Sequence, residues 1–114
     1  MQVAKELSWI DREENGYFIM VPKTIPDFKY EGDMQHNCVY ACGYFERVIK
    51  RQSIIVFLRE KKDTPYVTIE FDYETFDVLQ ALGKYNQRLD RRLYQFIVDL
   101  GKQLSIEMLS EQWY

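Results

Sequence analysis

The sequence lacks several features that mark well-known classes of protein. It has no apolar run near the roughly 18 residues that a membrane-spanning helix needs, and its first residues lack the apolar core of a secretion signal. It contains only two cysteines and one histidine. We therefore expect no membrane association and a cytoplasmic location.

A surplus of basic residues is also missing. Lys and Arg together number 15, whereas Asp and Glu number 18, so the formal net charge is −3. Proteins that bind nucleic acid mainly through its phosphates usually carry an excess of basic residues. Bulk nucleic-acid binding is therefore disfavoured, although a local basic patch is compatible with this composition.

The cysteines are too few and too close together to predict a disulfide framework or a zinc site. Cys38 and Cys42 are four positions apart, and His36 is the one histidine. Residues with this spacing share a helix face but seldom meet disulfide geometry, and a structural zinc site needs four ligands. We expect two reduced thiols, no metal and no cofactor.

Apolar and aromatic residues are plentiful. They make up 46% and 16% of the 114 residues, which excludes disorder as the default state and supplies large side chains for a core. The length fits one domain. We expect a single domain over residues 1–114.

The first half of the chain predicts one strand and two helices. Residues 16–21 form a short apolar run after a turn signal and predict a strand. Residues 24–31 predict a short helix that is capped by Thr24 and ends at Gly32. Apolar positions three and four residues apart predict a helix over residues 38–51.

The second half predicts the rest of a meander. Residues 53–59 are rich in β-branched side chains, residues 66–72 alternate between apolar and polar, and residues 76–83 follow after a short loop. The alternation places three apolar side chains of residues 66–72 on one face: Val67, Ile69 and Phe71.

An amphipathic helix should cover this sheet. Its apolar stripe consists of Leu89, Leu93, Phe96, Ile97, Leu100 and Leu104. Residues 105–114 are a candidate continuation, with Gly101 as a weak point. The predicted fold class is α+β: an antiparallel β-meander of at least three strands packed against short N-terminal helices and a C-terminal amphipathic helix.

Two residues in front of the helix predicted over residues 38–51 could carry chemistry. A cysteine at a helix N-terminus is more readily a thiolate, which makes Cys38 a candidate nucleophile. His36, two residues earlier, is a candidate general acid or base. The alternative is an inert cysteine and a histidine bonded to the backbone, and so short a motif favours this alternative.

A second group of candidates lies on the polar face of the predicted strand over residues 66–72. Thr68 and Glu70 share this face, a hairpin could bring Gln80 beside them, and Arg59 ends the neighbouring strand. If the face is covered, Glu70 needs a partner such as Arg59 or Lys84. The alternative, a solvated face or a structural ion pair, is favoured.

A third group follows the last predicted strand. Lys84 and Asn86 lie in a turn after Gly83, where backbone amides and a cation could hold an anion. The stretch is no P-loop, because it lacks the second glycine and the Lys-Ser/Thr pair. Asn86 is equally a candidate N-cap for the last helix.

Several motifs resemble, in the same order, those of the PcfJ-like protein family. They are Tyr30-Glu31-Gly32, His36-x-Cys38-Val39, Ile54-Ile55-Val56-Phe57-Leu58-Arg59, Thr64-Pro65-Tyr66-Val67-Thr68-Ile69-Glu70 and Val78-Leu79-Gln80-Ala81-x-Gly83-Lys84-Tyr85-Asn86. The resemblance runs from about Gly16 to the last helix. It implies a protein of conjugative plasmids, integrated elements or phages, in which the domain is usually the C-terminal module of a longer chain.

The sequence departs from the family pattern at three positions. Asn37 stands where the family often has a second histidine, and Tyr40 and Leu82 stand where it tends to have a glycine and an arginine. If that histidine or arginine carries an activity in the family, this chain has lost it.

Three functional hypotheses follow. The first, which we favour, is a non-catalytic module that binds a protein partner, such as an inhibitor of a host defence protein. The second is a metal-independent enzyme or binder acting on nucleic acid or a nucleotide, with His36 and Glu70 as acid and base. Its substrate-binding residues would be Arg59, Thr68, Gln80, Lys84 and Asn86. The third, with Cys38 as a covalent nucleophile, ranks last.

Overall fold

Five antiparallel strands form one sheet in the computed structural model, which describes residues 1–112. The order in the sheet is β1-β2-β3-β4-β5, so each strand pairs with the next one along the chain. The strands are β1 (Arg12–Glu14), β2 (Tyr17–Met20), β3 (Ser53–Arg59), β4 (Val67–Asp72) and β5 (Val78–Leu82). The predicted antiparallel meander is confirmed.

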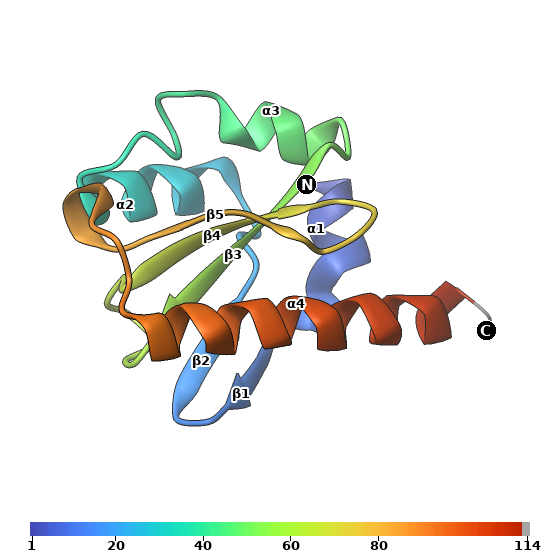
Figure 1. The fold of residues 1–114 in the computed structure, drawn as a ribbon. Coiled ribbons are helices and arrows are strands. Elements are labelled where there is room, and N and C mark those ends of the chain that lie inside the picture. Colours follow the sequence, from blue (N-terminus) through green and yellow to red (C-terminus); the bar gives the residue numbers. More distant parts are fainter. Residues whose placement is uncertain (113–114) are drawn as a thin grey trace.

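Helices cover both faces of this sheet (Figure 1). The long helix α4 (Arg91–Gln112) runs along one face, and α2 (Ile25–Gln35) and α3 (Tyr44–Ile49) lie over the other. The chain begins with α1 (Gln2–Leu7) and a 3-10 helix (Ser8–Ile10), and a second 3-10 helix (Lys84–Asn86) follows β5. The α+β class is confirmed. Of the predicted continuation over residues 105–114, the last two residues lie outside the described part.

The core lies mainly between α4 and the sheet. The predicted alternation in β4 is confirmed, because Val67, Ile69 and Phe71 are fully buried. The apolar stripe of α4 contributes Leu93, Ile97, Leu100 and Leu104 to the same cluster of buried side chains. The other face of β4 is covered as well, so the expectation of a solvated face is wrong for Glu70, whose relative exposure is only 6%.

Helix α2 begins as predicted but ends later. Thr24 and Asp27 form a reciprocal capping box at its N-terminus. The helix continues through Gly32 to Gln35, and His36 ends it in the left-handed conformation, with φ 53°. Gly32 is a buried position within the helix, and a Cβ there would make ordinary van der Waals contact with the Tyr40 Cβ at 3.5 Å.

The helix predicted over residues 38–51 is mostly absent. Residues 38–43 form turns, and α3 covers only Tyr44–Ile49. Gly43 has φ 74°, which interrupts a right-handed helix. Cys38 is therefore not at a helix N-terminus, and the expected electrostatic activation of its thiol has no basis.

The N-terminal residues form a helix followed by a hairpin. Residues 2–10 are helical, and Arg12–Glu14 pairs with Tyr17–Met20 across Asn15 and Gly16. Both of these turn residues have positive φ, 56° and 82°. An Asn-Gly pair with this geometry is typical of a two-residue hairpin turn. Within residues 1–112, no helix combines the length and apolar character needed to cross a membrane.

Candidate functional site

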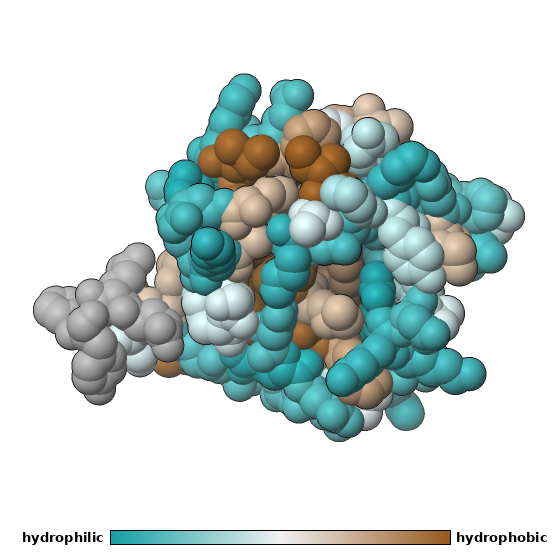
Figure 2. Space-filling model, turned by 180° about the vertical axis from the view of Figure 1, so that it is seen from behind, coloured by the Kyte–Doolittle hydropathy of each residue, from teal (hydrophilic) through white to brown (hydrophobic). Residues whose placement is uncertain are grey.

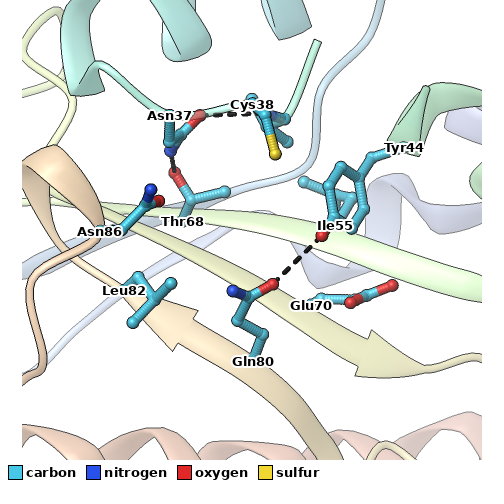
Figure 3. Close-up of a pocket in the computed structure, with 10 residues that line it drawn as sticks. Asn37, Cys38, Tyr44, Ile55, Thr68, Glu70, Gln80, Leu82 and Asn86 are labelled. Carbon is cyan, nitrogen blue, oxygen red and sulfur yellow. Dashed lines mark hydrogen bonds between the residues drawn. The ribbon is translucent and has the colours of Figure 1, made fainter. Parts of the chain in front are cut away.

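A small hollow opens on the sheet face that α2 and α3 cover (Figure 3). Strands β3, β4 and β5 form its floor, and the turns after α2 form one wall. Its lining residues are Asn37, Cys38, Val39, Tyr44, Ile55, Thr68, Glu70, Gln80, Leu82 and Asn86.

Strand register explains why these side chains meet. Glu70 pairs with Ile55 on one side and with Gln80 on the other, so the three residues form one row across the sheet. Thr68 pairs with Leu82 in the row two residues away. Since side chains alternate between faces, both rows point toward the hollow.

Glu70 is the buried charge of this site. Its Oε2 atom accepts hydrogen bonds from the Ser53 hydroxyl at 2.6 Å and from the Arg47 guanidinium at 3.1 Å. The expected partners, Arg59 and Lys84, are not the ones observed. Arg47 on α3 is half-exposed and closes the ion pair from the solvent side.

Arg59 instead belongs to a buried network beside the hollow. It donates to Glu31 at 3.0 Å, and Thr68 donates to the other oxygen of Glu31 at 2.9 Å. The Asn37 amide then donates to the Thr68 hydroxyl at 3.1 Å. Burial raises the pKa of Glu31, whereas the hydrogen bonds from Arg59 and Thr68 act in the opposite direction.

Two hydrogen bonds tie the wall of the hollow to its floor. One is the bond from Asn37 to Thr68, and the other runs from the Tyr44 hydroxyl to Gln80 Oε1 at 3.2 Å (Figure 3). The Arg47 guanidinium lies 4.7 Å from the centre of the Tyr44 ring, in cation–π contact. The wall is thus fixed at the start and at the end of residues 37–44.

His36 and Lys84 lie outside the hollow. The His36 ring stacks on the Tyr85 ring at a centroid distance of 4.4 Å, and the Lys84 ammonium lies 5.6 Å from the same ring. His36 and Tyr85 both have positive φ, and so does Asn86. Three non-glycine residues in this conformation mark a constrained junction between α2 and the loop after β5.

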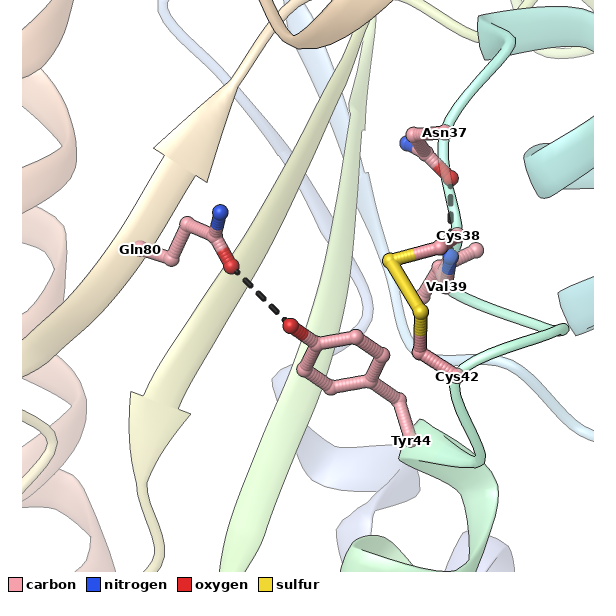
Figure 4. The surroundings of a disulfide bond; sticks show 6 residues. All are labelled: Asn37, Cys38, Val39, Cys42, Tyr44 and Gln80. Carbon is pink, nitrogen blue, oxygen red and sulfur yellow. Dashed lines mark hydrogen bonds between the residues drawn. A yellow bond between two sulfur atoms is a disulfide. The ribbon is translucent and has the colours of Figure 1, made fainter.

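The two cysteines form a disulfide, so the expectation of reduced thiols is wrong (Figure 4). The prediction assumed one helix for both residues. In the turns they adopt instead, their Cα atoms are 5.1 Å apart, within the range that a disulfide spans. Cys38, the candidate nucleophile, carries no free thiol in this state. Among the described residues, no group of three acidic, His or Cys side chains could hold a metal ion.

Comparison with known proteins assigns the chain to a family. The family model described as "PcfJ-like protein" matches residues 2–97. The chain belongs to the PcfJ-like family. The match covers the whole sheet, the residues that line the hollow and the first third of α4.

One curated relative of this PcfJ-like chain is the "Uncharacterized protein Lin1253/Lin1744" of Listeria innocua, with 26% identity over 77 residues. The aligned region covers 68% of this chain but only 17% of the Listeria protein. The chain therefore corresponds to a small part of that relative's length. No solved structure matches it.

The PcfJ-like fold brings together some of the predicted site residues and separates others. Five lie around the hollow: Cys38, Thr68, Glu70, Gln80 and Asn86. His36, Lys84 and Arg59 do not line it. Asn86 does not cap α4, because the carboxylate of Asp90 accepts the hydrogen bond from the Leu93 amide.

Sequence reasoning missed several residues that build this site. They are Glu31, Asn37, Tyr44, Arg47 and Ser53. For Glu31 the sequence held one signal, because this residue lies in the Tyr30-Glu31-Gly32 motif that resembles the family. Tyr44 and Arg47 gave no such signal, since the incorrectly predicted helix placed them elsewhere.

Proposed function

We propose that this PcfJ-like chain is an accessory protein of a mobile genetic element and that it acts by binding a protein partner. A plasmid with a role in conjugation, or a phage, is the proposed carrier. The proposed location is the cytoplasm, where such a protein would meet host proteins. An inhibitor of a host defence protein is one form that this function takes.

The charge of the hollow supports a protein ligand over a phosphate-bearing one. Among the described residues that line the hollow, none is Lys, Arg or His, and one is the buried Glu70. The nearby Arg47 already pairs with this carboxylate. A phosphate would meet a carboxylate and uncharged amides, whereas a neutral or basic side chain of a protein would find hydrogen-bond acceptors and apolar walls.

The surface around the hollow also suits a protein partner. Tyr85, beside Asn86, is 62% exposed, and Tyr40, within the turns of the wall, is exposed as well. On the face opposite to the one seen in Figure 1, the surface is mostly hydrophilic, with hydrophobic side chains near its upper edge and at its centre (Figure 2). Exposed aromatic residues are enriched where proteins bind each other.

The test compares partner capture by two matched variants. Gln80→Arg places a larger, charged side chain on the floor of the hollow and removes the hydrogen bond from Tyr44. Gln95→Arg makes the same change at an exposed position of α4, on the other side of the sheet. We expect a host protein captured by the wild type to be retained by Gln95→Arg and lost by Gln80→Arg. Circular dichroism establishes that both variants are folded.

A partner retained equally by both variants would contradict the hollow as the binding surface. The competing function, an enzyme or binder acting on nucleotides, is tested on the same samples. If ATP, or a short RNA, shifted the NMR signals of Glu70, Gln80 and Asn86 and no protein were captured, the nucleotide reading would replace the one proposed.

A further inference from the structure

The disulfide lies at the wall of the hollow rather than in the core. Cys38, which is bonded to Cys42 (Figure 4), lines the hollow. Both cysteines are exposed to solvent. A disulfide is broken by a thiolate that reaches one of its sulfur atoms, so exposure decides whether exchange is possible. A small thiol can reach this bond without unfolding of the protein.

Apart from the disulfide, the segment that it closes is held by two turn hydrogen bonds, by the buried Val39 and by stacking of the Tyr40 ring on Phe45. Residues 38–43 form turns, with backbone hydrogen bonds from Cys42 to Cys38 (2.7 Å) and from Gly43 to Tyr40 (3.1 Å). Val39 is the buried residue that anchors the segment to the core. Because the sequence separation is only four residues, the bond restrains this segment and crosslinks no distant elements.

This segment connects the two hydrogen bonds that hold the wall to the floor. Asn37, just before Cys38, donates to Thr68 and accepts from the Val39 amide at 3.0 Å. Tyr44, two residues after Cys42, donates to Gln80. The disulfide therefore sets the spacing between the two points at which the wall contacts β4 and β5.

We propose that the Cys38–Cys42 bond is a site of thiol–disulfide exchange with a low-molecular-weight thiol of the glutathione class, and that its reduction releases the wall of the hollow. The inference deepens the proposed function, on which it rests for the cytoplasmic location and for the effect on partner binding. Most disulfides in cytosolic proteins are transient or redox-sensing rather than structural.

The exchange balances with glutathione as the reductant. The thiolate of one glutathione attacks a protein sulfur, forms a mixed disulfide and releases the other cysteine as a thiolate, which takes up a proton. A second glutathione thiolate then attacks the glutathione sulfur of the mixed disulfide and releases the second cysteine. The protein gains two electrons and two protons, and two glutathiones become one glutathione disulfide.

The test uses the whole chain labelled with ¹⁵N, in mixtures of reduced and oxidised glutathione. Iodoacetamide labelling with mass spectrometry counts the free thiols, and amide NMR signals report the conformation. We expect two free thiols to appear in reducing mixtures, together with shifts at residues 37–44 and at the side-chain amides of Asn37 and Gln80. The signals of α4, on the opposite face of the sheet, should stay in place.

A double variant, Cys38→Ser with Cys42→Ser, gives the matched control. Its spectrum should resemble that of the reduced wild type and should not respond to glutathione. Two thiols that react freely in fully oxidising mixtures would overturn the proposal, and so would reduction that leaves the signals of Asn37 and Gln80 unmoved. These measurements need no partner, so a failure of the proposed function is distinguishable from a failure of the exchange.

Discussion

Glu31 shows how burial changes the pKa of one carboxyl group inside this fold. Its side chain is fully buried on α2, and its two carboxylate oxygens accept from Arg59 and Thr68. Burial raises the pKa of Glu31 above its ordinary value of 4.5. The folded protein thus keeps a proton on this side chain at pH values where the unfolded chain has released it.

The raised pKa of Glu31 predicts a pH-dependent stability. The contribution of Glu31 is fully present below pH 4.5 and declines as the pH rises through the raised pKa, because the folded state binds more protons there. In Glu31→Gln, position 31 has no carboxyl group that titrates. Between the unfolded and the folded pKa of Glu31, the wild type should therefore lose up to about 1.4 kcal/mol of unfolding free energy per pH unit relative to this variant. Urea denaturation from pH 4 upward measures the difference.

Replacement of an exposed carboxylate, Glu46→Gln, is the control for that series. Its unfolding free energy should follow the wild-type curve. The raised pKa of Glu31 would be contradicted if the difference in unfolding free energy between wild type and Glu31→Gln did not change with pH. It would also be contradicted if the wild type became relatively more stable as the pH rises.

At the scale of elements, Gly101 decides how closely α4 approaches the sheet. The sequence marked this glycine as a weak point, but the helix runs through it without a break. A Cβ at this position would lie 2.5 Å from the carbonyl oxygen of Phe76 and 2.9 Å from Cε1 of Phe71. The missing side chain therefore allows α4 to pack closely against Phe71 of β4 and Phe76 of the loop between β4 and β5.

Gly101→Ala should lower the unfolding free energy by about 1–3 kcal/mol, because the clash forces the helix and the sheet apart. This loss would outweigh the roughly 1 kcal/mol that alanine gains over glycine in helix propensity. Lys102→Ala, on the exposed side of the same turn, should change stability by less than about 0.5 kcal/mol. Urea denaturation followed by circular dichroism measures both, and a more stable Gly101→Ala would refute the packing argument.

At the scale of the whole molecule, one apolar cluster joins residues from all parts of the chain. It includes Val3 of α1, Ile19 of β2, Phe71 of β4 and Leu104 of α4. Arg12 in β1 also forms a two-pronged ion pair with Glu107 in α4, at 2.6 and 2.8 Å. The Cα radius of gyration is 13.1 Å, close to the ~13 Å of a compact domain of about 100 residues.

Because these contacts span the sequence, we predict that the chain unfolds in one cooperative step. Far-UV circular dichroism reports the helices, and the methyl NMR signals of Val3 and Leu104 report the two ends of the core. The urea midpoints of all three signals should coincide. Separate midpoints would show that residues 1–114 hold more than one folding unit.

Local patterns were enough to predict most of the elements. The alternation of Val67, Ile69 and Phe71 and the capping signal at Thr24 each depend on neighbours within a few residues, and the structure confirms both. The helix predicted over residues 38–51 failed because the same spacing of apolar residues can arise in turns that pack one side chain, Val39, into the core. Periodicity alone does not register the break at Gly43.

The sequence by itself determined the fold class, four of the five strands and the resemblance to the PcfJ-like family, because these follow from short-range spacing and residue type. The strand β1 was not predicted, since it has only three residues and they are polar. Only the tertiary structure decided the partners: Arg47 and Ser53 for Glu70, Glu31 for Arg59, and Cys42 for Cys38. Glu70 could have paired with any nearby cation. The choice depended on strand register and on where the turns after α2 place α3, and both are properties of the packed chain.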